Sequence, residues 1–217
     1  MLPKKVKNPW NRYCELMRRH PKAFVQSDGL PIITDPFAVS EFANQTGVEI
    51  GVIYESPVWF WVVDLVQGPE GLVASERLLP VRKEAEVVAI PVYNDRYFVL
   101  VEEGRQVLQN AQLAFPRGEG IPGMSPAQNA AERLAEALQA EVLSYGMLGS
   151  LSLDEASGGG SAYVILCRIT QPDVGVGDSG LPRLVLCSMD DLKWKIAAGE
   201  IGDLVTLGAY GMLAARI

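Results

Sequence analysis

The sequence predicts an α+β fold in which helices pack against a mixed β-sheet. Beyond residue 84 its segments follow the order strands, helix, strands, helix, and the strand segments are rich in β-branched and aromatic residues. The composition, 48% hydrophobic and 21% charged, is typical of a soluble globular protein, and 217 residues are enough to bury a sizeable core. We therefore expect an N-terminal α/β extension over residues 1–83 and a larger sheet domain over residues 84–217.

Two helices are expected in the N-terminal extension. The Asn8-Pro9 pair favours a short helix, because proline suits the first position of a helix. A second helix is expected from Asp35, or the residue after it, to Gln45, and Gly47 closes it.

The rest of the extension is expected to form strands and a hairpin. Residues 48–81 consist of β-branched and aromatic runs that are broken by Ser-Pro and by Gln-Gly-Pro-Glu-Gly. Trp59 and Trp61 are two residues apart, so they lie on one face of a strand. This spacing favours core or interface packing over a platform for stacking bases.

The sheet domain is expected to contain two strands joined by an Asn-Asp turn, a short strand before a Gly-rich loop, a helix, two strands around a Gly-Gly-Gly loop, one more strand and two helices. The first of these helices begins with Ser125 as N-cap and Pro126 as its first residue. Ser188 is the expected cap of the next helix. The strands are expected within residues 85–95, 96–104, 112–120 and 184–188, and two more lie within residues 141–170 on either side of the Gly-Gly-Gly loop. The helices are expected at residues 125–139, 188–201 and 202–217.

The charge of the chain argues against several classes of partner. Its net charge is −7, which disfavours binding to nucleic acid or to an anionic membrane through bulk electrostatics. Residues 1–22 have a positive bias, which we interpret as a solvated N-terminus. No run approaches the roughly 18 apolar residues that span a membrane, and no signal peptide is recognised. We therefore expect a cytoplasmic protein that binds neither nucleic acid nor membrane.

The cysteine and histidine content excludes several kinds of site. The three cysteines, Cys14, Cys167 and Cys187, are scattered and have neither the CxxC spacing of a zinc site nor the even number of a disulfide scaffold. Cys167 and Cys187 lie in apolar runs and are expected to be small buried hydrophobic residues. The single histidine, His20, excludes a multi-histidine metal site.

The most informative stretch is FPRGEGIPGMSPAQNAAERLAEALQA, residues 115–140. A strand, a Gly-rich loop and a helix with carboxylates one turn apart form a suitable arrangement for Mg²⁺-assisted attack on a diphosphate. Magnesium prefers carboxylate, phosphate and water oxygens, and glutamates at i and i+4 share one helix face. The metal would neutralise the phosphate charge and activate water.

This stretch resembles the box of the Nudix hydrolases, G-x5-E-x7-R-E-U-x-E-E-x-G-U with U apolar, and more closely that of their ADP-ribose pyrophosphatase branch. Without gaps, Gly118 takes the first glycine and residues 123–126 cover what is commonly Gly-Glu-Ser-Pro. Ala130, Ala131 and Leu134 fit the apolar positions of the helix.

The resemblance continues beyond the box. Residues 148–169 look like the strand–loop–strand that follows it, and residues 190–217 are similar to the branch's C-terminal pattern. The resemblance therefore covers residues 84–217 and implies the Nudix fold, a mixed sheet sandwiched by helices. It also implies a homodimer in which residues 1–83 serve dimerisation and complete the nucleotide site.

The box departs from the family pattern at the positions that carry carboxylates. In the family, the metal ligands are mainly the Glu of the Arg-Glu pair and the second Glu of the Glu-Glu pair, which are here Arg133 and Ala137. A guanidinium at the first position removes a ligand and repels Mg²⁺. The full set of departures is Met124 for the first glutamate, Glu132-Arg133 for Arg-Glu, Glu136-Ala137 for Glu-Glu, and Gln139 for the last glycine.

A one-residue shift would restore a glutamate pair, because Glu132 and Glu136 are themselves at i and i+4. That shift turns the helix by about 100°, moves Arg133 into an apolar position and breaks the Gly-x-Ser-Pro match. The ungapped register is therefore favoured, with Glu132 and Glu136 as a solvated or salt-bridged edge. Glu136 alone can still flank the old site, and Glu119 is a further candidate metal ligand, although a loop carboxylate is more often solvated.

Other residues are candidates for holding a substrate. By resemblance, Arg105 lies near the position where family members often have an arginine that helps to hold phosphate. Asp178 lies in the region of a loop that often supplies acidic residues for positioning water in this branch. Arg117, beside Gly118, could bind phosphate directly and without metal. The acidic residue that usually precedes the box is replaced by Ala114.

Three functions stay open on this basis. The favoured hypothesis is a Nudix-fold protein that has lost most of its metal-binding glutamates and binds a nucleoside-diphosphate derivative or acts as a non-catalytic module. The alternative is an active Mg²⁺-dependent hydrolase of an ADP-ribose-like compound that uses Glu132 and Glu136, with Glu119 as a further metal ligand. The third is a structural interaction protein with a filled pocket.

Overall fold

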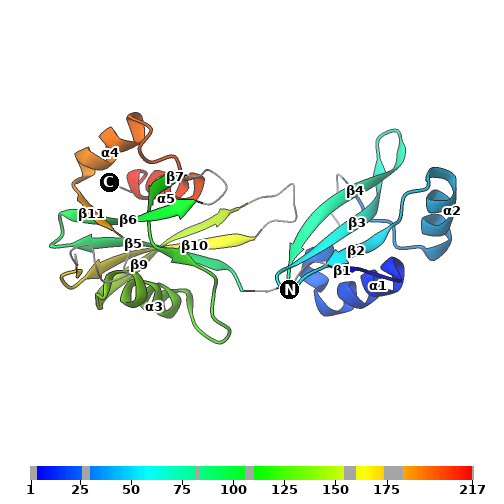
Figure 1. Ribbon diagram of the computed structural model, residues 1–217, viewed down its shortest axis with the longest axis horizontal. Helices are drawn as coiled ribbons and strands as arrows, with labels where there is room; N and C mark the ends of the chain where they lie inside the picture. Colours follow the sequence, from blue (N-terminus) through cyan, green and yellow to red (C-terminus); the bar gives the residue numbers. More distant parts are fainter. Residues whose placement is uncertain are drawn as a thin grey trace. The chain divides into compact units, whose positions relative to one another are not determined.

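A computed structural model of the 217-residue chain describes residues 4–25, 30–81, 84–105, 110–153, 160–173 and 183–216. Contacts divide the chain into two compact units, which are described separately below (Figure 1). The first unit is Met1–Lys83 with Asp154–Gly160, and the second is Glu84–Leu153 with Ser161–Ile217.

The helices of the first unit begin and end at the signals that the sequence contains. Helix α1 spans Pro9–Arg19, and the Asn8 side chain caps it by accepting a hydrogen bond from the backbone N–H of Asn11. Helix α2 spans Pro36–Thr46 and ends at Gly47, whose φ of 75° is left-handed. A 3₁₀ turn, η1 (Pro21–Phe24), was not expected from the sequence.

An antiparallel four-stranded sheet completes the first unit, in the order β1 (Lys4–Lys5), β2 (Gly51–Glu55), β3 (Trp59–Gly68) and β4 (Gly71–Pro80). Tyr13 and Leu16 of α1 pack on one face against Phe60 and its buried neighbours. On the other face Trp59 and Trp61 stay 46% and 38% exposed, so they do not belong to the core of this unit.

A buried polar network lies between α1 and the sheet. The Asp64 carboxylate, almost fully buried, accepts a hydrogen bond from the Tyr13 hydroxyl. The Arg77 guanidinium forms an ion pair with the same carboxylate, with 3.0 Å between Nη2 and Oδ1. Arg77 also donates to the carbonyl oxygen of Ala23 at 2.8 Å, so this network ties η1 to the sheet. A buried carboxylate is tolerated here because its oxygens have partners.

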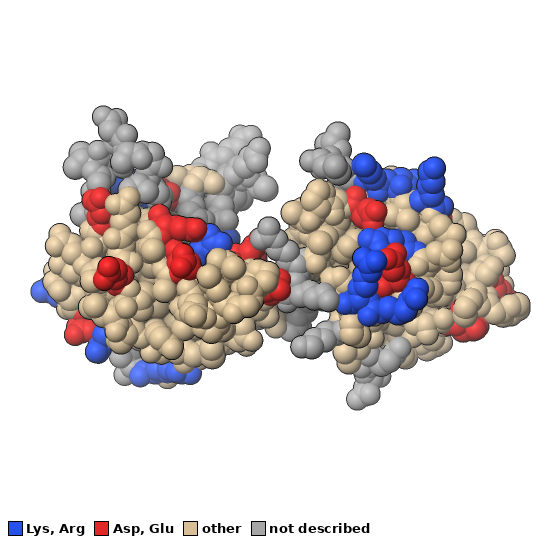
Figure 2. All heavy atoms as spheres, turned by 90° about the horizontal axis from the view of Figure 1, so that it is seen from below, with Lys and Arg blue, Asp and Glu red and all other residues tan. Residues whose placement is uncertain are grey.

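Basic side chains of α1 lie on the surface and are partly neutralised. Arg12 pairs with Glu15 and Glu55, each at 2.8 Å, and Arg19 also pairs with Glu15. Figure 2 shows Lys and Arg side chains gathered around acidic ones on one face of the first unit. The positive bias of the N-terminal segment is therefore partly offset by local ion pairs.

The second unit contains a mixed seven-stranded sheet. Its main order is β11-β6-β5-β10-β9, while β7 pairs with β6 and β8 pairs with β5. Strands β5 and β10 run parallel, whereas the other pairings are antiparallel. The strands are β5 (Glu86–Tyr93), β6 (Tyr97–Arg105), β7 (Asn110–Ala114), β8 (Arg117–Gly118), β9 (Val142–Ser152), β10 (Ser161–Ile169) and β11 (Leu184–Cys187).

Helices cover both faces of this sheet, as the α+β prediction requires (Figure 1). Along β5, Val87 and Ala89 point toward α3 (Pro126–Leu138), whereas Val88 and Ile90 point toward α4 (Met189–Ala197) and α5 (Leu204–Ala214). The alternation follows from the two-residue period of a strand, so one short sequence supplies both cores.

The cysteines behave as small hydrophobic residues, as expected. Cys167 and Cys187 are fully buried, and burial raises the pKa of the Cys167 thiol to about 12. Within the described part of the chain, no helix combines the length and the apolar character that crossing a membrane requires.

Candidate functional site

Helix α3 is positioned by its N-terminal cap and its buried face. The Ser125 hydroxyl accepts from the Gln128 backbone at 3.3 Å, and the Gln128 side chain accepts from the Ser125 backbone at 2.8 Å, which forms a capping box. Ala130, Leu134 and Leu138 are fully buried against the sheet. The predicted apolar positions Ala130 and Leu134 are thereby confirmed, whereas Ala131 is half-buried.

The face of α3 that meets the Gly-rich loop carries Arg133. A Cβ atom added to Gly118 would lie 2.2 Å from Arg133 Nε and 2.5 Å from Cζ, so the side chain packs directly on this glycine. Arg133 Nη2 lies 3.4 Å from the carbonyl oxygen of Glu119, and Nη1 lies 2.8 Å from Glu136 Oε2. A side chain at position 118 would therefore force the Arg133 guanidinium to move.

The other acidic and small residues of α3 differ in their exposure to solvent. Glu132 is exposed, and Glu136 is 63% exposed in its side chain although it pairs with Arg133. Ala137 is half-buried and packs against the core cluster between α3 and the sheet. The residue directed at Gly118 is therefore a cation, and one carboxylate accompanies it.

Arg117, a candidate for phosphate binding, lies in a different environment. Its Nη2 is 3.4 Å from Asp203 Oδ1, and both side chains are largely buried. Asp203 caps α5 by accepting from the Thr206 backbone at 2.9 Å and from the Thr206 hydroxyl at 2.7 Å. The Thr206 hydroxyl oxygen in turn accepts from the Phe115 backbone at 3.1 Å. Arg117 thus joins β8 to α5.

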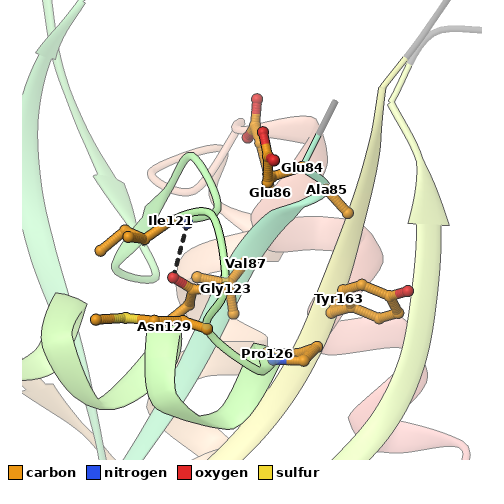
Figure 3. A pocket seen from close by; sticks show the side chains of 10 residues that line it. Glu84, Ala85, Glu86, Val87, Ile121, Gly123, Pro126, Asn129 and Tyr163 are labelled. Carbon is orange, nitrogen blue, oxygen red and sulfur yellow. Dashed lines mark hydrogen bonds between the residues drawn. The ribbon is translucent and has the colours of Figure 1, made fainter. Parts of the chain in front are cut away.

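A pocket of about 250 Å³ lies beside Met124, at the start of α3. Figure 3 shows Ile121 and Tyr163 on opposite sides of the pocket, and Glu84 and Glu86 also line it. Asn129 closes one side, where its side-chain oxygen accepts from the Ile121 backbone at 2.9 Å.

The charge of this pocket disfavours a phosphate. Neither Lys nor Arg occurs among the described residues that line it, whereas two carboxylates, Glu84 and Glu86, do. Carboxylates repel a diphosphate, so the pocket is better suited to an uncharged or cationic part of a ligand.

Comparisons with known proteins identify the fold. Neither a family model nor a curated protein matches the sequence. Among solved structures, an ADP compounds hydrolase superposes with a TM-score of 0.66 and 13% identity, over 78% of this chain and 91% of that chain. The fold is the Nudix fold. A NUDIX hydrolase from Nitrosomonas europaea is also similar, with a TM-score of 0.47 and 22% identity over 62% of this chain and 90% of that chain.

Helix α3 and the loop before it contain the residues that resemble the Nudix box in sequence. Leu134 is fully buried, whereas the Arg133 side chain is 30% exposed and packs on Gly118. In the described ranges, no group of three or more His, Cys, Asp or Glu side chains is arranged to hold a metal ion.

Two candidate residues lie partly or wholly beyond what the structure describes. Asp178 is outside the described residues, and so is the side chain of Arg105, although its backbone ends β6. Glu119 is exposed, and its backbone carbonyl oxygen lies 3.4 Å from Arg133 Nη2. Sequence reasoning identified Arg133 as a misfit in the box but missed its contact with Gly118, because that contact depends on how the loop folds over α3.

Proposed function

We propose that this Nudix-fold chain binds a nucleoside-diphosphate derivative without hydrolysing it by the Mg²⁺ route. The single observation that carries the proposal is the position of Arg133, packed on Gly118 and paired with Glu136. A cation that belongs to the protein occupies the face where a hydrolase of this fold would need carboxylates.

The residues around Gly118 do not fit a magnesium ion. Mg²⁺ needs near-octahedral oxygen ligands and usually one or two carboxylates. The Glu136 carboxylate, which lies on α3 beside Arg133, already pairs with the guanidinium. The positively charged guanidinium would also repel a divalent cation bound next to Gly118. By contrast, an anionic diphosphate is attracted to the same guanidinium.

Binding and turnover of ADP-ribose test this proposal. The purified chain, freed of metal with EDTA, is titrated with ADP-ribose by calorimetry, and phosphate release is then measured with Mg²⁺ and with Mn²⁺ after a phosphatase step. We expect binding in EDTA and no metal-dependent release. If the chain neither binds ADP-ribose in EDTA nor binds or hydrolyses it with metal, the proposal fails and a structural role is favoured.

An active hydrolase that uses Glu132 and Glu136 is the second candidate. The observation in its favour is that the Arg133 ion pair keeps Glu136 close to the Gly-rich loop. Metal-dependent release of phosphate that disappears in Glu136→Gln would establish this candidate, with Mg²⁺ as its cofactor, and would overturn the binding proposal.

We further propose that the chain is a cytoplasmic homodimer that associates through the first unit. Trp59 and Trp61 support this, because their exposure on one sheet face, beside an exposed Leu78, is unusual for a monomer. Cys14, Cys167 and Cys187 are all free thiols, which suits a reducing compartment. Light scattering should give twice the chain mass, and Trp61→Arg should reduce it to one chain. A monomeric wild type would contradict this.

A further inference from the structure

We propose that the Arg133 guanidinium is the group that binds the ligand's phosphate and that Glu136 is its displaceable internal counter-ion. This inference rests on the proposed function and assigns its anion site. The free protein would then hold a carboxylate where the ligand places a phosphate, and binding would exchange one anion for the other.

Arg133 is anchored well enough to serve as a fixed anion receptor. Its side chain packs on Gly118, and Nη2 is directed at the Glu119 carbonyl oxygen at 3.4 Å. The side chain is nevertheless 30% exposed, so an anion can approach it from solvent. A guanidinium held in this way loses little side-chain entropy on binding and can form paired hydrogen bonds with phosphate oxygens.

Glu136 has the properties of a counter-ion that a ligand can displace. It lies three residues from Arg133 on the same helix, and 2.8 Å separates Nη1 from Oε2. Its side chain is 63% exposed, so water can solvate the carboxylate as soon as it leaves the guanidinium. Exposed ion pairs of this kind are weak, whereas charge-assisted bonds from arginine to phosphate are among the stronger ones.

Among the described residues, the neighbouring charges favour Arg133 over Arg117 and the pocket as the anion site. Arg117 already forms an ion pair with Asp203, which joins β8 to α5. The pocket at the start of α3 has Glu84 and Glu86 in its lining, which repel phosphate. These carboxylates would direct the phosphates toward Arg133 and leave the pocket to the uncharged part of the ligand.

Four proteins test the inference by titration with ADP-ribose in EDTA: the wild type, Arg133→Gln, Glu136→Gln and Glu141→Gln. Glu136→Gln removes the competing carboxylate, so we expect its Kd to fall by about three- to fivefold, the factor that corresponds to a surface ion pair. Arg133→Gln should raise the Kd by at least about tenfold, because a charged hydrogen-bond donor is lost. Glu141→Gln, an equal loss of charge just beyond α3, should leave the Kd unchanged.

The outcomes separate this inference from the function on which it rests. If the wild type does not bind, both fail. If the wild type binds but Glu136→Gln and Arg133→Gln bind equally well, the function stands and the anion site is wrong. If Glu141→Gln tightens binding as much as Glu136→Gln, the gain is a general effect of charge and the counter-ion role is excluded. Melting curves and an Arg133→Lys variant, expected to retain part of the affinity, guard against a fold defect in Arg133→Gln.

Discussion

At the scale of single residues, Arg133 links the Gly-rich loop to α3. Its guanidinium joins the Glu119 carbonyl oxygen of the loop to the Glu136 carboxylate of the helix. A divalent cation that bridges a loop and a helix would make a similar link between backbone and carboxylate oxygens. The guanidinium is therefore a permanent positive charge that connects the loop to the helix.

Arg133→Glu should make the stability of the fold depend on Mg²⁺. The substitution places two glutamates three residues apart beside the loop carbonyls, so they repel each other without metal and can share a cation with it. We expect a lower Tm than that of the wild type in EDTA and a partial recovery on adding Mg²⁺. Arg133→Gln is the control and should show no response to Mg²⁺. If the Tm of Arg133→Glu were equally insensitive, the idea of a cation position at Gly118 would be wrong.

Gln139 is a second residue that affects stability, because its backbone conformation is less favourable for glutamine than for glycine. It ends α3 in the left-handed region, with φ 51° and ψ 35°, where glycine is favoured because it lacks a Cβ atom. Gln139→Gly should therefore raise the free energy of unfolding by about 0.5–1 kcal/mol. Urea denaturation measures this, and Gln139→Ala, which keeps the Cβ atom, should give no gain.

At the scale of elements, the cap of α5 joins three parts of the second unit. Asp203 caps the helix, pairs with Arg117 of β8, and holds the Thr206 hydroxyl that binds the Phe115 backbone. The start of α5 is therefore fixed to the strand that leads into the Gly-rich loop, and the position of the loop depends on this helix.

Asp203→Ala should lower the free energy of unfolding by about 1–2 kcal/mol, since an N-cap and a largely buried ion pair are lost together. Asp203→Asn keeps the cap but not the charge, so it should fall between the wild type and the alanine variant. Urea denaturation of the three proteins gives the comparison. Equal losses in both variants would show that the ion pair, and not the cap, carries the stability.

The elements that could be predicted are those with local signals. Asn8, Ser125 and Ser188 cap helices that begin where their side chains predicted, and the Asn94-Asp95 turn follows from the tolerance of these residues for positive φ. The two-residue strands β1 and β8 and the direction of Arg133 could not be predicted, because each depends on a partner far away in the sequence. The sequence shows which residues differ from the box pattern, but it does not predict the contacts of Arg133 with Gly118 and Glu136.

At the scale of the whole molecule, the buried network of the first unit predicts how that unit responds to alkali. Burial and the neighbouring Asp64 carboxylate raise the pKa of Tyr13 above its ordinary value of 10.0. Because folding raises this pKa, its contribution to stability is complete below pH 10 and is lost as the pH rises further.

Tyr13→Phe should lower stability at pH 7 by about 1 kcal/mol, since one buried hydrogen bond to Asp64 is lost. The variant should also lose less stability than the wild type between pH 9 and pH 11. Tryptophan fluorescence during urea denaturation can follow this, because Trp10 stacks on Tyr13 with 5.3 Å between ring centroids. If the wild type and Tyr13→Phe lost the same stability between pH 9 and pH 11, the loss would come from groups other than Tyr13.

The parallel pairing of β5 and β10 also has a consequence during synthesis. Ala162 pairs with Glu86, which the ribosome adds 76 residues earlier, and β5 contributes to both cores of its unit. Until β10 has left the ribosome, the strand at the centre of the sheet has neither its parallel partner nor its completed cores. The nascent chain therefore exposes an apolar strand for several seconds at usual elongation rates of about 5–20 residues per second. Chaperones that bind extended apolar segments should recognise residues 86–93 in that interval and release them once β10 has docked.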